Sequence, residues 1–204
     1  MSCGNDEYLL KDTLNLKEKY NIDTFVESGC YYGWTLREIH DKFQKIYSCD
    51  INQTFIDEAW NHIRKGDVSA GSNIEISHMD GASHLEYLYK NKKIKNKNFI
   101  LFSDGHEGGK TSELDELKVM IEYGLKPIII YHDFKNPNHN EFNYDVFDVG
   151  DNDIELVKPK LDECFGKNNY ELQYNDNSSQ NVGYLIIIPN IYNLNKGEWV
   201  NTQN

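Results

Sequence analysis

Short apolar runs alternate with amphipathic segments through most of this 204-residue sequence. Runs such as Phe99-Ile100-Leu101-Phe102 and Pro127-Ile128-Ile129-Ile130-Tyr131 are typical of parallel strands, which are covered on both faces. A glycine or an acidic residue follows each run within a few positions, and a segment with helical spacing comes next. This alternation predicts βαβ units and therefore a doubly wound α/β fold.

Seven strands and six helices follow from the pattern. The predicted strands are 24–27, 45–49, 73–77, 99–102 and 127–131, with 170–174 and 182–188 as a final hairpin. The predicted helices are 7–20, 35–43, about 53–63, 82–89, 112–123 and 154–165. We expect a Rossmann-like, mostly parallel seven-stranded sheet with a C-terminal antiparallel hairpin and helices on both faces.

Bulk properties restrict the domain organisation and the partners. We expect one domain over 1–204, with an N-terminal helix within 1–22 and a flexible tail over 193–204. The formal charge of −12 disfavours nucleic acid as a partner, and no stretch approaches the roughly 20 apolar residues of a membrane span. Four cysteines without C-x-x-C spacing fit a reducing cytoplasm, so we expect a cytoplasmic protein.

Polar residues cluster where the predicted strands end. Because parallel strands direct their carboxyl ends to one edge of a sheet, we expect these residues to converge on one crevice. They are Glu27, Gly29 and Gly33 after the first strand, Asp50 after the second, Asp80 after the third, Asp104 and His106 after the fourth, and His132 and Asp133 after the fifth.

The first of these motifs, Val26-Glu27-Ser28-Gly29-Cys30-Tyr31-Tyr32-Gly33, resembles the acidic-x-Gly loop of class I S-adenosylmethionine-dependent methyltransferases. The resemblance covers roughly residues 24–133. It implies that the glycine backbone approaches the methionine part of the cofactor, that Asp50 holds the ribose hydroxyls and that Asp80 lies near the adenine. The cofactor-binding residues implied in this way are Glu27, Gly29, Tyr31, Gly33, Asp50, Asp80 and Gly81.

Two further segments are similar to a subgroup of that family. Asp104-Gly105-His106 gives an Asp-x-His after the fourth strand, and Tyr131-His132-Asp133-Phe134 ends the fifth strand with His-Asp and an aromatic residue. The subgroup includes O-methyltransferases that act on small molecules and sugars, and some of its members hold a divalent ion at these two strand ends. The resemblance therefore implies a small-molecule acceptor, with methyl transfer to oxygen.

Removal of the acceptor's proton can occur in two ways. His106 or His132 could act as the base near neutral pH, with Asp104 as a third catalytic residue. Alternatively, Asp104 and Asp133 could hold Mg²⁺, which lowers the pKa of a bound hydroxyl. Phe134 stands where metal-binding members commonly have an amide, which disfavours a complete magnesium site.

Two other functions remain open from the sequence. One is a metal-dependent oxygenase or hydrolase on the same scaffold, and the other is a ligand-binding protein without turnover. A homodimer is also left open as the assembly.

Overall fold

The computed structural model describes residues 6–65, 71–105 and 111–193. Its main sheet consists of β1 (Thr24–Ser28), β2 (Lys45–Asp50), β3 (Ile74–His78), β4 (Ile100–Ser103), β5 (Ile128–Tyr131), β8 (Tyr170–Tyr174) and β9 (Leu185–Pro189). The strand order is β3-β2-β1-β4-β5-β9-β8. The first five strands are parallel, and β9 is antiparallel to both β5 and β8. The predicted fold class is confirmed.

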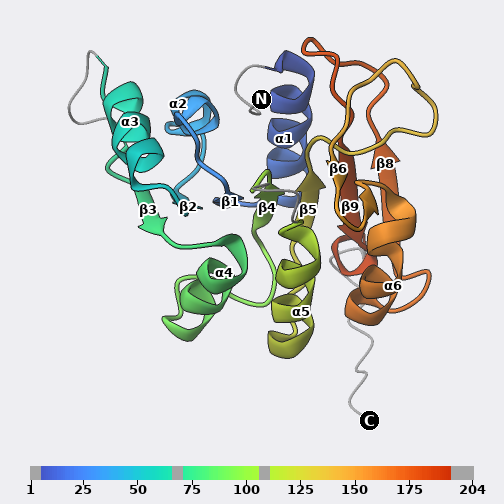
Figure 1. The fold of residues 1–204 in the computed structure, drawn as a ribbon. Coiled ribbons are helices and arrows are strands. Elements are labelled where there is room, and N and C mark those ends of the chain that lie inside the picture. Colours follow the sequence, from blue (N-terminus) through green and yellow to red (C-terminus); the bar gives the residue numbers. More distant parts are fainter. Residues whose placement is uncertain (1–5, 66–70, 106–110, 194–204) are drawn as a thin grey trace.

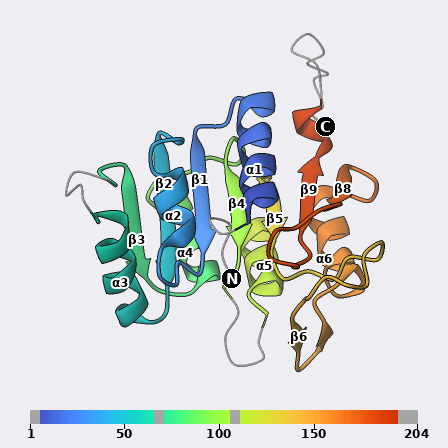
Figure 2. The same ribbon diagram turned by 90° about the horizontal axis from the view of Figure 1, so that it is seen from above.

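Helices cover both faces of the sheet. One face carries α1 (Glu7–Tyr20), α2 (Trp34–Ile39) and α3 (Gln53–Ile63), and the other carries α4 (Gly81–Lys90), α5 (Glu113–Tyr123) and α6 (Ile154–Phe165) (Figure 1). Figure 2 shows the strands side by side with α1 to α3 in front, and the arrowheads of the parallel strands point to the same edge.

Strand side chains alternate between two hydrophobic cores. In β1, Phe25 packs in the core beneath α1, α2 and α3, while Val26 packs in the core beneath α4, α5 and α6. Both are fully buried, as is every residue of β4 and β5. This two-sided burial explains why those strands read as continuous apolar runs.

The boundaries differ from the prediction at a few places. Helix α2 ends at Ile39, although the predicted helix ran to residue 43, and strand β9 begins at Leu185, although the predicted strand began at residue 182. A small antiparallel pair, β6 (Val146–Phe147) and β7 (Gly150–Asp151), lies in the segment after β5 that was expected to be loop. A short 3-10 helix, η2 (Asn190–Tyr192), follows β9. The tail expected over 193–204 lies, beyond Asn193, outside the described residues.

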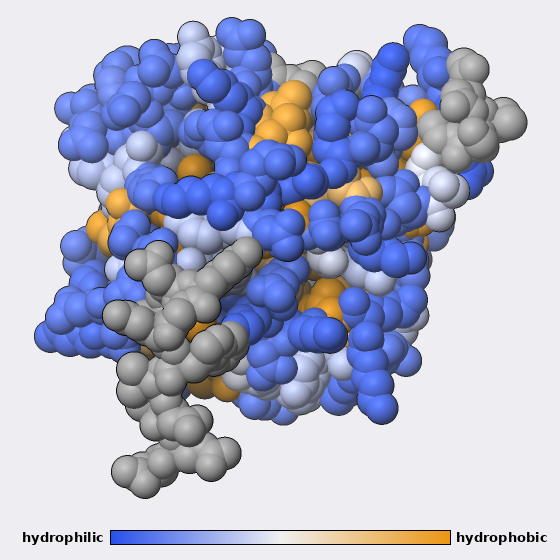
Figure 3. Space-filling view, turned by 180° about the vertical axis from the view of Figure 1, so that it is seen from behind, coloured by the Kyte–Doolittle hydropathy of each residue, from blue (hydrophilic) through white to orange (hydrophobic). Residues whose placement is uncertain are grey.

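The surface is largely hydrophilic. Figure 3 shows polar residues over most of one face, with hydrophobic residues in small separate patches. Within the described part of the chain, none of the helices combines the length and apolar character that a membrane crossing requires.

Candidate functional site

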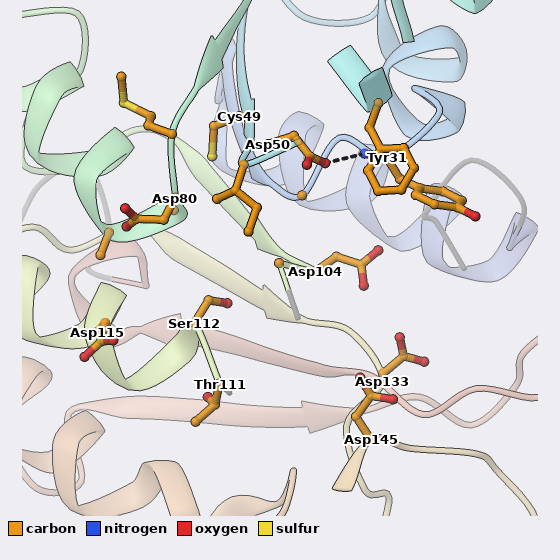
Figure 4. A pocket seen from close by; sticks show the side chains of 17 residues that line it. Tyr31, Cys49, Asp50, Asp80, Asp104, Thr111, Ser112, Asp115, Asp133 and Asp145 are labelled. Atoms are coloured by element: carbon orange, nitrogen blue, oxygen red, sulfur yellow. Dashed lines mark hydrogen bonds between the residues drawn. The ribbon is translucent and has the colours of Figure 1, made fainter. Parts of the chain in front are cut away.

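A cavity of about 520 Å³ lies at the carboxyl edge of the parallel strands. Figure 4 shows its acidic side chains, which come from segments far apart in the sequence. The described lining residues come from the ends of β1 to β5, the first turns of α3, α4 and α5, the segment before α5 and the segment before β6. They are Gly29, Tyr31, Cys49, Asp50, Ile51, Phe55, Met79, Asp80, Gly81, Ala82, Asp104, Gly105, Thr111, Ser112, Asp115, Asp133 and Asp145.

Gly29 is required at the end of β1 by its surroundings. Its φ of +88° lies in the left-handed region, and a Cβ there would be 2.5 Å from the carbonyl oxygen of Asp104. Any side chain would therefore collide with the backbone after β4. The missing side chain lets the backbone after β4 pack directly against this turn, and Gly29 itself lines the cavity.

Gly33, predicted to bind the cofactor, is absent from the described lining of the cavity. A Cβ on this residue would lie 2.9 Å from the Cα and Cβ of Ala59 on α3. Gly33 also precedes α2, with a φ of +74°. Its geometry thus explains the close packing of α2 against α3, and its cofactor role stays a prediction.

Glu27 lies beneath the cavity and does not line it. The side chain is 1% exposed, and the Ser48 hydroxyl donates a hydrogen bond of 2.6 Å to its Oε2 atom. Burial raises the pKa of Glu27 to about 8, although the Ser48 hydrogen bond lowers it. Glu27 can therefore hold a proton near neutral pH.

Asp50 organises the loop at the mouth of the cavity. Its Oδ2 accepts the backbone N–H of Tyr31 at 3.0 Å, and its Oδ1 accepts that of Asn52 at 2.9 Å. Tyr31 has a φ of +45°, which is uncommon for a bulky residue. The hydrogen bond from Tyr31 to Asp50 is drawn in Figure 4. A carboxylate retains further lone pairs, so Asp50 can also accept hydroxyl groups of a ligand.

Aromatic rings form one wall beside Asp50. Tyr31 and Phe55 both line the cavity, and their ring centroids are 4.8 Å apart in an edge-to-face arrangement. Tyr32 contacts both rings, and Tyr31 remains 45% exposed. Such a wall suits a planar or apolar part of a ligand.

Asp80 caps helix α4 and lines the cavity. Its carboxylate accepts the Ser83 N–H at 2.9 Å and the Ser83 hydroxyl at 2.7 Å. Although partial burial opposes the shift, these hydrogen bonds lower the pKa of Asp80. The next residue, Gly81, leaves no room for a Cβ, which would meet Glu116 and would lie 2.5 Å from Ser28 Oγ.

Three residues form an ionic cluster at the ends of β4 and β5, in which His132 is buried and the two carboxylates are partly exposed to the cavity. His132 Nδ1 lies 3.2 Å from Asp104 Oδ1 and 3.2 Å from Asp133 Oδ2. Complete burial lowers the pKa of His132, but the two carboxylates outweigh it and raise the pKa to about 10. Because both neighbours are acceptors, Nδ1 is the ring nitrogen that carries a proton, and the raised pKa favours the imidazolium near neutral pH.

The structure brings most predicted site residues together. Asp50, Asp80, Gly81, Asp104 and Asp133 line one cavity with Gly29 and Tyr31, and His132 lies directly behind Asp104 and Asp133. His106 falls outside the described residues.

Sequence reasoning missed several residues of the site. Among them are Phe55, Asp115 and Asp145, which line the cavity, and Asn152, which supports its wall. Asp115 is in the first turn of α5, where an acidic residue is common for electrostatic reasons alone. Asp145 and Asn152 lie in a polar segment with no periodic signal, so only the three-dimensional contacts identify them.

The same ionic cluster is the one group of described residues whose donor atoms could hold a metal ion. The ligand atoms of Asp104, His132 and Asp133 lie within 4.8 Å of one another. However, the protonated Nδ1 of His132 already donates toward both carboxylates, and a metal ion would have to displace that proton. The arrangement as it stands fits an ion pair better than a magnesium site.

Comparisons with known proteins support the fold. No family model and no curated protein matches the sequence. Among solved structures, a putative caffeoyl-CoA O-methyltransferase from Staphylococcus aureus has a TM-score of 0.57 at 12% identity, over 90% of this chain and 84% of that one. The N-methyltransferase NodS from Bradyrhizobium japonicum, in complex with S-adenosyl-L-homocysteine, has a TM-score of 0.51 at 9% identity, over 91% and 88%.

A spermidine synthase from Thermotoga maritima is also similar, with a TM-score of 0.54 at 17% identity, over 90% of this chain and 60% of that one. The likenesses therefore extend across enzymes with different reactions. At these identities they establish the architecture, and the function has to be argued from the site.

Proposed function

We propose that the chain binds S-adenosylmethionine and transfers its methyl group to an oxygen of a small metabolite or sugar. The observation that carries the proposal is the single cavity in which Gly29, Asp50 and Asp80 meet Asp104 and Asp133. The names of the similar structures, which include O- and N-methyltransferases, and the S-adenosyl-L-homocysteine bound to NodS support it.

The cavity fits the cofactor in size and in chemistry. About 520 Å³ is within the range of small-molecule sites. Gly29 lines the cavity, Asp50 offers acceptor atoms for ribose hydroxyls, and Ile51 and Phe55 supply an apolar surface for the adenine ring. When bound, S-adenosylmethionine supplies a methyl group activated by a sulfonium.

The acceptor's proton has to be removed by a residue on the other side of the cavity. The two carboxylates raise the pKa of His132 to about 10, which favours its protonated form near neutral pH and disfavours it as the base. We assign that role to Asp104, which lines the cavity, while His132 holds the carboxylates of Asp104 and Asp133 in place. His106 remains the second proposed catalytic residue.

Calorimetric titration of the protein with S-adenosylmethionine and with S-adenosylhomocysteine tests this proposal directly. We expect saturable binding of both compounds, with affinities that do not depend on added Mg²⁺. Absence of binding to either compound, with the protein shown to be folded by circular dichroism, would refute the proposed function.

A second function is favoured by the grouping of Asp104, His132 and Asp133, which could hold a metal in an oxygenase or hydrolase. Titration with Mn²⁺ in the absence of cofactor discriminates between the two. Tight Mn²⁺ binding that is lost in Asp104→Asn, together with no binding of S-adenosylhomocysteine, would favour the metal-dependent enzyme.

A further inference from the structure

Asn152 connects the segments on the acceptor side of the cavity. It lies between β7 and α6 and is completely buried. Its Nδ2 group donates to the backbone oxygens of Asp133 at 3.1 Å and His132 at 3.3 Å, and lies 3.3 Å from Glu113 Oε1. Its backbone N–H donates to the carbonyl of Asp145 at 2.9 Å. One residue thereby joins the end of β5 to α5 through its side chain, and to the segment just before β6 through its backbone.

The turn that Asn152 holds is a strained one. Asp133 has a φ of +49°, in the left-handed region that costs a residue with a side chain roughly 1–2 kcal/mol. The Asp133 carbonyl accepts both Asn152 Nδ2 and the backbone N–H of Asp145, the latter at 2.9 Å. In this conformation the Asp133 carboxylate lines the cavity and contacts His132. Strain of this kind persists only when the surrounding contacts maintain it.

We propose that Asn152 is a positioning residue for the methyl transfer, because it fixes the Asp133 turn and through it the His132 contact. The proposal rests on the proposed function. The chemistry of the site calls for an amide, since the group faces three oxygen atoms and must donate hydrogen bonds to them. A carboxylate of the same shape would place a negative charge against those oxygens.

Two substitutions and one matched control test the role. Asn152→Asp keeps the shape and removes the donors, and Asn152→Ser retains a single donor. Asn140→Asp makes the same chemical change at an exposed position on the connection between β5 and β6. The measurements are thermal unfolding, S-adenosylhomocysteine binding by calorimetry, and the His132 Nδ1–H proton signal in NMR spectra of histidine-labelled protein. Turnover is then measured as the rate of S-adenosylhomocysteine formation with the best acceptor from a panel of sugars and phenols.

We expect Asn152→Asp to shift or broaden the His132 signal and to lower turnover by about tenfold or more. Its KM for S-adenosylmethionine and its affinity for S-adenosylhomocysteine should stay within about twofold of wild type, since the cofactor side is not contacted. The turnover of Asn152→Ser should lie between those of wild type and Asn152→Asp. Asn140→Asp should match wild type in turnover and in the His132 signal. An unchanged His132 signal and turnover in Asn152→Asp would overturn the proposal, as would losses of cofactor affinity and turnover in equal proportion.

Wild-type protein gives an independent measurement if Asn152→Asp does not fold. The side-chain amide protons of Asn152 should exchange with solvent much more slowly than those of Asn140, and equal rates would overturn the proposal. A wild-type protein that fails to bind S-adenosylhomocysteine refutes the proposed function, whereas the NMR comparison still decides whether Asn152 fixes the Asp133 turn.

Discussion

Replacing Glu27 by glutamine tests the electrostatics beneath the cavity. Burial raises the pKa of Glu27 from 4.5 to about 8 in the folded chain. Because the folded value lies above the unfolded one, the folded chain binds more protons between these two values. The free energy of unfolding therefore decreases as the pH rises through that window.

The size of the effect follows from the two pKa values. They differ by about 3.5 units (8 − 4.5), and one unit corresponds to about 1.4 kcal/mol. Between about pH 5 and 7.5, Glu27 is ionised in the unfolded chain and protonated in the folded chain. The free energy of unfolding should therefore fall by about 1.4 kcal/mol per pH unit in this range. At pH 7.5 the accumulated loss is about 4 kcal/mol.

Glu27→Gln keeps the side-chain shape and an acceptor for Ser48, and it removes the ionisation. Urea unfolding at several pH values should show wild type and variant equally stable near about pH 4.5, and the variant more stable by about 4 kcal/mol at about pH 7.5. Glu58→Gln, an exposed change on α3, should follow wild type throughout. Parallel stability curves for wild type and Glu27→Gln would refute the raised pKa.

Three other substitutions give defined outcomes. Asp50→Ala should weaken S-adenosylhomocysteine binding by about 1.5–3 kcal/mol, and an unchanged calorimetric affinity would remove Asp50 from the cofactor site. Gly29→Ala should lower the free energy of unfolding by more than about 1 kcal/mol, because its Cβ would lie 2.5 Å from the Asp104 oxygen at a positive φ; wild-type stability in urea would contradict this geometry. His132→Gln should cost about 3–5 kcal/mol at neutral pH by leaving two carboxylates without their cation. The stabilisation from His132 is complete below pH 6.5 and is lost as the pH rises to about 10, so the difference in urea stability should shrink over that range; a constant difference would argue against a raised pKa.

The acidic ends of the strands could be placed from the sequence because their positions follow from local rules. Asp50, Asp104 and Asp133 each come directly after a buried apolar run or within one residue of it, and parallel strands bring such ends together. The alternation of side chains also explains why Glu27 does not line the cavity. Glu27 is two residues from Phe25 and therefore lies on the same face of β1.

Contacts between distant segments could not be predicted in this way. Gly33 and Ala59 are 26 positions apart in the sequence, and only the packing of α2 on α3 shows why a glycine is needed there. Asn152 lies in a polar stretch that looks like an ordinary loop, and its importance comes from oxygens contributed by β5 and α5. The ionic state of His132 likewise depends on two carboxylates, one of them 28 residues away.

The position of β9 between β5 and β8 has a consequence for biosynthesis. Residues 185–189 pair with β8, residues 185–187 also pair with β5, and all five are buried. During translation β5 and β8 leave the ribosome before the strand that joins them, so the growing chain keeps an apolar, unpaired β5 edge until late in synthesis. Nascent chains stalled before residue 185 should therefore bind chaperones or aggregate, and the sheet should close only after β9 emerges.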